Sequence, residues 1–169
     1  GVQIAAVALG GTVALSPKGR EVGIGRKVSL TPEGRGHPMY TGKKSCFHAF
    51  MSHGDEVVIP PSGAVITSSN DHSRIQGMAV TRNGTESWFV QYHPEYDLKY
   101  YAQLIGARKE RMTAMGFFKN EEQIDLYVED FTALRDEGAE VRKDVAWQYG
   151  IDEDIWNMDL RQCEARNWL

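Results

Sequence analysis

The dipeptide Asn83-Gly84 is the feature that most restricts the fold of this chain. It separates two runs, residues 75–81 and 87–92, in which apolar residues alternate with polar ones. Asn-Gly readily adopts the positive φ angles of a tight two-residue turn, and alternation with a period of two places one face of each run on a core. The sequence therefore predicts an antiparallel β-hairpin over residues 75–92.

Other short apolar runs predict further structure on the N-terminal side of the hairpin. Runs rich in β-branched residues predict strands, because such side chains pack well on a pleated surface. An Ala-rich run at residues 2–9 predicts a helix that ends at Gly10-Gly11. Residues 31–44 are rich in Gly and Pro and predict a loop. The predicted strands are residues 22–30, 57–59 and 64–67.

After Pro94 the pattern changes to helix. Apolar residues recur at helical spacing, and residues 120–123, Asn-Glu-Glu-Gln, resemble a capping box that opens a helix. The sequence thus predicts an α/β domain at residues 1–96, with a helical C-terminal extension at residues 97–169 packed on the same domain. The tryptophans at 147, 156 and 168 are expected to be core or interface anchors. The residues expected to dock the tail are Trp156, Leu160, Trp168 and Leu169.

Composition and charge argue against several classes of protein. The hydrophobic fraction of 41% and the charged fraction of 25% are typical of a globular domain. The net charge is −4 and basic residues are not clustered, so neither nucleic acid nor a membrane is expected as a partner. The two cysteines, Cys46 and Cys163, lie outside any C-x-x-C pattern. Isolated thiols favour a reducing cytoplasm over a disulfide framework.

Gly1 is followed at once by the apolar residues of the first predicted helix. There is no initiator methionine, and no basic region of the kind that a signal peptide carries. We therefore expect the chain to begin in the middle of a fold, as a fragment, a processed product or an incomplete chain.

The end of the hairpin carries the residues with the most evident chemistry. His93 follows a strand, and Pro94 restricts it to an extended conformation. The carboxylate of Glu95 can hydrogen-bond one ring nitrogen, and the other nitrogen can then activate a nucleophile. His93 and Glu95 are therefore a candidate base and its orienting group. The alternative is an ordinary His and Glu on the surface of a turn.

Several separated segments resemble class I glutamine amidotransferases. Residues 90–95, Val-Gln-Tyr-His-Pro-Glu, resemble the family signature in which a His and a Glu complete a triad with a Cys. Residues 1–3, Gly-Val-Gln, resemble the end of the nucleophile elbow Gly-x-Cys-x-Gly-x-Gln, which places the Cys two residues before Gly1. Residues 52–57 and 60–64 resemble a loop and strand of GMP synthetase-type domains.

The resemblance implies a flavodoxin-like α/β fold with a central parallel sheet and an antiparallel hairpin, of which this chain supplies the second part. It implies hydrolysis of the glutamine side-chain amide to glutamate and ammonia through a thioester, without a cofactor. His93 would act as the general base and Glu95 would orient it. The substrate-binding residues that the resemblance implies are Gln3, Met51, Ser52 and His53.

Two other functions are compatible with the same segments. One is a non-catalytic relative that kept the glutamine pocket for a regulatory or partner-binding role, and the other is a hydrolase of γ-glutamyl amides. A Cys two residues before Gly1 would favour the enzyme, whereas Ser, Gly or Ala there would favour the binder. A homo-oligomer and an ammonia-accepting synthetase, as a domain or a separate polypeptide, are both compatible partners.

The remaining histidines and Cys46 have simpler explanations. His53 is either a second base or a loop histidine bonded to the backbone, and His37, before Pro38, is structural. His48 and His72 have no partner at metal-ligand spacing, so the sequence predicts no metal site. Cys46 does not lie on a strand-turn-helix elbow and is expected to be a small buried residue, not a replacement nucleophile.

Overall fold

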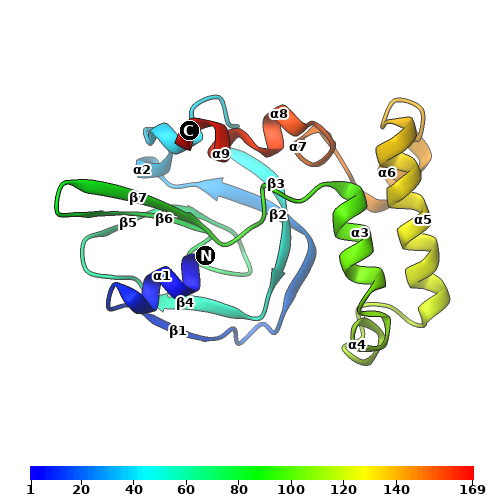
Figure 1. Ribbon diagram of the computed structural model, residues 1–169, viewed down its shortest axis with the longest axis horizontal. Helices are drawn as coiled ribbons and strands as arrows, with labels where there is room; N and C mark the ends of the chain where they lie inside the picture. Colours follow the sequence, from blue (N-terminus) through cyan, green and yellow to red (C-terminus); the bar gives the residue numbers. More distant parts are fainter. The chain divides into compact units, whose positions relative to one another are not determined.

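The computed structural model describes residues 1–169 in full and divides into two compact units. The first unit contains Gly1–Glu95 together with the C-terminal segment Asp159–Leu169, and the second contains Tyr96–Met158. Figure 1 shows the first as a curled sheet with short helices and the second as a group of helices. The domain boundaries predicted from the sequence, residues 1–96 and 97–169, stay a prediction.

The first unit is built on a five-stranded sheet in the order β3-β2-β5-β6-β7. Every neighbouring pair in this sheet is antiparallel, so the central parallel sheet that the family resemblance implied is not found among the strands of this chain. Parallel neighbours need a crossover of about a dozen residues, whereas β6 and β7 are joined by a tight turn. The strands are β2 (Glu21–Leu30), β3 (Cys46–His53), β5 (Ala64–Ser69), β6 (Gly77–Arg82) and β7 (Thr85–Val90).

The predicted hairpin is confirmed as β6 and β7, which pair in register up to Arg82 opposite Thr85. Asn83 and Gly84 form the turn, with φ angles of 53° and 78°. A two-residue turn with positive φ at both positions matches the right-handed twist of the two strands. The turn thus sets the register with which β7 returns toward His93.

A two-stranded antiparallel sheet packs with the first helix. Val2 and Ala6 of this helix are buried with Val57. A Cβ atom on Gly11 would lie 2.7 Å from the carbonyl oxygen of Ile59, so the chain can turn this close to the sheet only with glycine. The elements are α1 (Val2–Ala8), β1 (Thr12–Leu15) and β4 (Asp55–Ile59).

The predicted helix and strands of the first unit are confirmed within a few residues, but β1 and β3 were not predicted. The resemblance to GMP synthetase-type domains placed Ser52 and His53 in a loop. They belong to β3, where backbone pairing with β2 continues as far as His53 opposite Glu21. The predicted loop at residues 31–44 contains only short helical turns, α2 (Pro32–Arg35) and η1 (Pro38–Tyr40).

The C-terminal segment is held in the first unit by a buried ionic network. Lys43 Nζ lies 3.0 Å from Glu164 Oε2, and the Tyr92 hydroxyl donates to Glu164 Oε1 at 2.5 Å. All three side chains are almost completely buried. Because removal of one partner would leave a buried charge, this network ties α9 (Cys163–Trp168) to the segment before His93.

The expected anchoring by large apolar residues is wrong for the tail. Trp168 and Leu169 are 68% and 97% exposed, and the buried residues of α9 are Cys163 and Glu164. Trp147 is not a core residue either, since it is 85% exposed. Hydrophobic character alone could not identify the anchors, because the segment is attached through small and charge-paired side chains.

The second unit is organised around α5 (Glu121–Glu137), which buries one apolar face. The predicted cap is present: the Asn120 side chain accepts from the Gln123 N–H at 3.0 Å. The Gln123 side chain accepts from the N–H of Lys119, one residue before the cap.

None of the helices is both long and apolar enough to span a membrane. The other helices are α3 (Leu98–Gly106), α4 (Lys109–Ala114), α6 (Lys143–Tyr149) and α7 (Glu153–Trp156), and α8 (Met158–Arg161) follows at the boundary.

Candidate active site

The first unit contains a pocket of about 350 Å³ where three of its segments meet. These are the start of α1, the end of β3 and the turn that follows β7, which lie far apart in the sequence. Of the predicted site residues, all except Met51 line the pocket. The lining residues are Gly1, Val2, Gln3, Ser52, His53, Val90, Gln91, Tyr92, His93, Pro94 and Glu95.

His93 and Glu95 form a hydrogen-bonded pair in this pocket, with 2.7 Å between His93 Nδ1 and Glu95 Oε1. An ionised carboxylate can only accept, so Nδ1 carries the proton and, in the neutral ring, Nε2 holds the lone pair. That lone pair is what a general base uses to take a proton from a nucleophile. The two side chains are 29% and 63% exposed, which keeps the pair accessible to a substrate.

The pKa of the Glu95 carboxyl lies below its ordinary value. Partial burial by itself would raise this pKa, but the hydrogen bond with His93 lowers it, as do a backbone hydrogen bond and the charge of His93. Glu95 is therefore ionised at neutral pH. This is the form that accepts the His93 proton and stabilises an imidazolium.

Backbone hydrogen bonds position the segment that carries His93. The His93 N–H donates to the carbonyl oxygen of Phe50 in β3 at 2.9 Å, and the Gln91 N–H donates to the Gln76 carbonyl at 2.8 Å. Phe50 is completely buried. Pro94 restricts His93 on its other side. The histidine is therefore held by β3 and by the residue before β6, and not by β7 alone.

Gln3 and Ser52 lie on the pocket, whereas Met51 lies behind it. The side-chain amide of Gln3 donates to the Asp55 carbonyl oxygen at 2.9 Å, so β4 orients this side chain. Met51 is completely buried in the core cluster of β2 and β3. Contact between Met51 and a substrate could therefore come only from its backbone.

His53 lines the pocket but has both ring nitrogens bonded inside the protein. Nδ1 lies 3.1 Å from the Asp55 carbonyl oxygen, and Nε2 lies 2.9 Å from Glu21 Oε2. The residue is only 5% exposed. The structure thus favours the bonded histidine over the second base. Glu21 and its neighbour His72 were missed, because no sequence spacing connects them with His53.

Cys46 and His37 lie outside the pocket. Cys46 is exposed at the start of β3, so the expectation that it is buried is wrong. Cys46 and His53 stand at opposite ends of β3, and only His53 lines the pocket. Cys46 is therefore not placed to act as the nucleophile. His37 is structural as predicted, since its Nδ1 accepts from the Met39 N–H at 3.2 Å and caps η1.

Comparison with known proteins identifies the family of this chain. Residues 1–109 match the family model described as glutamine amidotransferase class-I. The chain is 30% identical over 173 residues to the γ-glutamyl-L-1-hydroxyisopropylamide hydrolase of a Pseudomonas species, an alignment that covers 100% of the chain and 57% of that protein. It is 39% identical over 98 residues to a glutamine-hydrolysing GMP synthase subunit of Saccharolobus solfataricus, covering 56% of the chain and 47% of that protein.

Solved structures show the same fold. A glutamine amidotransferase from Thermotoga maritima matches with a TM-score of 0.60 and 17% identity, over 90% of this chain and 60% of that one. A glutamine amidotransferase from Methylobacillus flagellatus matches with a TM-score of 0.55 and 15% identity, over 99% and 60%. The chain spans about half the length of the curated relatives it matches. Since the family match over residues 1–109 includes every residue that lines the pocket, this chain belongs to the class I glutamine amidotransferase family.

Proposed function

We propose that the protein hydrolyses the side-chain amide of glutamine to glutamate and ammonia through a Cys-His-Glu triad. The observation that carries this proposal is the 2.7 Å bond between His93 Nδ1 and Glu95 Oε1, in a pocket that also includes the start of α1. In the register of the elbow, the cysteine stands two residues before Gly1. The position of Gly1 on the pocket supports a nucleophile within reach of His93.

In the proposed reaction, His93 Nε2 takes the proton of the cysteine thiol and the thiolate attacks the amide carbon of the substrate. His93 then donates this proton to the amide nitrogen, the C–N bond breaks, and ammonia leaves a thioester behind. A water molecule, deprotonated by the same histidine, attacks the thioester and releases glutamate and the thiol. Glu95 accepts the Nδ1 proton throughout and stabilises the imidazolium.

Gln3 and Ser52 are proposed to hold the substrate, together with backbone groups of Met51 and His53. The amide of Gln3 is oriented by the Asp55 carbonyl, which supports a directed contact with the substrate. The Gln3→Ala variant should raise KM more than it lowers kcat, because it removes binding and not proton transfer. A selective loss of kcat would contradict this role.

The test uses the full-length protein that contains this chain. Ammonia release from glutamine is measured for wild type, for His93→Ala, and for Arg82→Ala, an exposed control at the hairpin turn. The His93 variant should lose about a thousandfold or more in kcat/KM, as triad members do, and the control should not. Equal rates would refute the role of His93. Ser, Gly or Ala two residues before Gly1 would replace this function with non-catalytic binding in the pocket.

A second candidate, hydrolysis of N-substituted γ-glutamyl amides, is favoured by one observation. The Pseudomonas hydrolase matches over 100% of this chain, whereas the Saccharolobus GMP synthase protein matches over 56%. The same triad would release an alkylamine in place of ammonia. Comparison of kcat/KM for glutamine and for a series of γ-glutamyl alkylamides separates the two. A preference for glutamine of more than about tenfold, or 1.4 kcal/mol, would exclude the second candidate.

Ammonia that is transferred and not released needs an acceptor. The GMP synthase relatives favour a synthetase, as a domain or a separate polypeptide, for the partner that consumes it. We place this activity in the reducing cytoplasm, because the proposed nucleophile works as a free thiolate. Co-purification of a tagged full-length protein with a synthetase tests the partnership, and recovery of a glutaminase without one contradicts it.

A further inference from the structure

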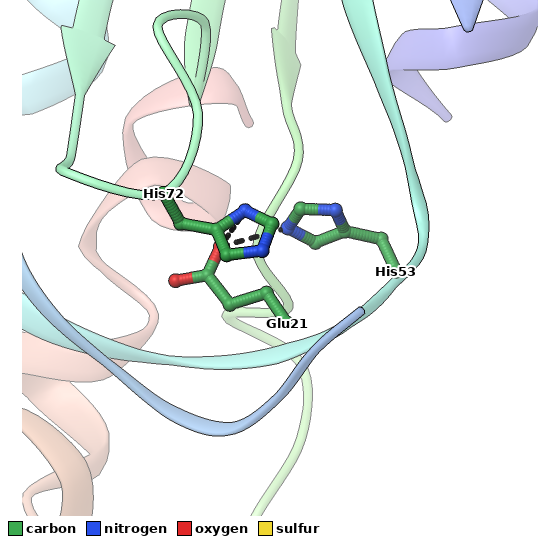
Figure 2. A group of neighbouring side chains, drawn as sticks. All are labelled: Glu21, His53 and His72. Atoms are coloured by element: carbon green, nitrogen blue, oxygen red, sulfur yellow. Dashed lines mark hydrogen bonds and ion pairs between the residues drawn. The ribbon is translucent and has the colours of Figure 1, made fainter. Parts of the chain in front are cut away.

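Glu21, His53 and His72 come together from three segments of the first unit. They lie at the start of β2, at the end of β3 and in the turn between β5 and β6. Figure 2 shows both imidazole rings beside the Glu21 carboxylate. One ligand atom from each residue lies within 4.8 Å of the other two.

The tautomer of His53 is set by the backbone. Its Nδ1 lies 3.1 Å from the carbonyl oxygen of Asp55, which can only accept a hydrogen bond. Nδ1 is therefore protonated, and in the neutral ring Nε2 presents a lone pair. That lone pair faces Glu21 Oε2 at 2.9 Å. A ligand histidine in a metal site is commonly held in this way, with one nitrogen bonded to a carbonyl and the other directed at the metal.

Glu21 is held as an ionised, oriented carboxylate. Asn70 Nδ2 donates to its Oε1 at 2.6 Å, and Gln76 Nε2 donates to its Oε2 at 2.9 Å. With Nδ1 already protonated, His53 Nε2 and Glu21 Oε2 lie 2.9 Å apart with either a second His53 proton or a cation between them.

His72 completes the cluster. Its Nδ1 lies 3.6 Å from Glu21 Oε2, and its ring packs edge-on to that of His53 with 5.5 Å between the centroids. The other nitrogen, Nε2, is buried without a hydrogen-bond partner, as is Oε1 of the adjacent Gln76. Each of these atoms loses hydration that nothing in the folded chain replaces, which is costly for a polar group.

We propose that Glu21, His53 and His72 bind a divalent transition-metal ion of the Zn²⁺ type. Two imidazoles and one carboxylate are ligands that such ions accept. In tetrahedral coordination with bonds of about 2.0–2.1 Å, neighbouring ligand atoms lie about 3.3 Å apart. The observed separations of 2.9 Å and 3.6 Å bracket this value. The ion would cross-link β2, β3 and the turn between β5 and β6, beside the pocket that His53 lines.

The competing structure is a metal-free ion pair, in which His53 carries a second proton between Nε2 and Glu21. The two structures differ in their need for His72. A protonated His53 bonds Glu21 without help, whereas a metal site with one carboxylate and a single imidazole has lost a third of its protein ligands. The His72 Nδ1 that faces Glu21 also lies 3.1 Å from Ser73 Oγ, so metal binding would replace this local hydrogen bond. Because Ser73 is the next residue in the chain, His72→Ala removes no bond between distant segments in the metal-free ion pair.

The experiment titrates the full-length protein with ZnCl₂ by calorimetry and with CoCl₂ by visible absorption. Wild type is compared with His72→Ala and with Asp71→Ala, a control in the same turn whose side chain is fully exposed. His93→Ala is included because the proposed catalytic thiol and histidine can bind Zn²⁺ as well. We expect His72→Ala to lose one equivalent of metal, or to weaken it by at least about 100-fold.

Asp71→Ala and His93→Ala should both retain that equivalent. At a hundredfold excess of Zn²⁺ over its dissociation constant, the melting temperature of wild type should rise by about 5–10 °C, and that of His72→Ala should not. Unchanged binding in His72→Ala, or a wild-type dissociation constant above about 10 μM, would overturn the proposal and leave the ion pair. The result does not depend on glutaminase activity, so failure here and failure of the proposed function are separate outcomes.

Discussion

The first unit contains two histidine–glutamate pairs with similar bond lengths and very different surroundings. His93 and Glu95 are 2.7 Å apart, with side chains 29% and 63% exposed. His53 and Glu21 are 2.9 Å apart, with side chains 4% and 12% exposed. The distance between the bonded atoms therefore does not distinguish the pair proposed to be catalytic from the pair proposed to bind a metal ion. The exposure of the side chains does distinguish the two pairs.

The difference teaches how the same two side chains acquire different tasks. The His93 ring lies at the pocket surface, where a substrate can reach it, and its carboxylate comes from the next turn of the chain. The His53 ring is bonded at both nitrogens, and its carboxylate comes from another strand. Burial makes the second pair important for stability, because each partner that is removed leaves the other desolvated and unpaired.

The largest expected effect concerns activity. In the full-length protein, His93→Ala should lower kcat/KM about 10³–10⁴-fold, because the variant lacks the general base of the proposed triad. Its melting temperature should change by less than about 2 °C, since exposed ion pairs contribute little to stability. Ammonia release and calorimetry measure the two quantities. A variant that is both inactive and strongly destabilised would make this pair resemble the buried one.

The second prediction concerns stability, which should depend strongly on the buried pair His53 and Glu21. Glu21→Ala should lower the free energy of unfolding by about 2–4 kcal/mol, because it removes the acceptor shared by His53, Asn70 and Gln76. Urea denaturation at pH 7, with EDTA present, measures the change. Glu21→Gln keeps an oxygen acceptor and should recover part of the loss. If both variants are as stable as wild type, the network does not stabilise the fold.

The third prediction concerns the orienting carboxylate. Glu95→Gln should lower kcat by about 10- to 100-fold with little change in KM, because an amide oxygen still accepts from Nδ1 but does not stabilise the imidazolium charge. Steady-state kinetics on glutamine would show it. A wild-type kcat in this variant would mean that Glu95 only neighbours His93.

The smallest effect depends on pH. The pKa of Glu21 is lowered in the folded state, so its stabilisation is fully present above the ordinary value of 4.5 and is lost as the pH falls through the lowered value. The difference in unfolding free energy between wild type and Glu21→Gln should therefore shrink on acidification below the ordinary value of 4.5. Urea titrations from about pH 3 to 7 measure this difference. An increase at low pH would show that the pKa is not lowered.

Local features of the fold could be predicted because few residues determine them. Asn83 and Gly84 specify their turn through φ angles that they adopt readily, and Asn120 caps α5 through a bond to a residue three positions away. β3 could not be predicted in the same way. Its polar end at Ser52 and His53 becomes a strand only because β2 supplies the backbone hydrogen bonds.

The sequence by itself determined the pair His93 and Glu95, and with residues 1–3 it predicted the family that the comparisons show. Two residues separated by one proline are neighbours in almost any conformation, so the bond between His93 and Glu95 does not depend on contacts with distant parts of the chain. Only the tertiary structure decided that Glu21, His53 and His72 meet, that Met51 lies behind the pocket, and that Trp147 is exposed. These depend on which strands pair and which faces are buried, and such long-range contacts leave no fixed spacing in the sequence.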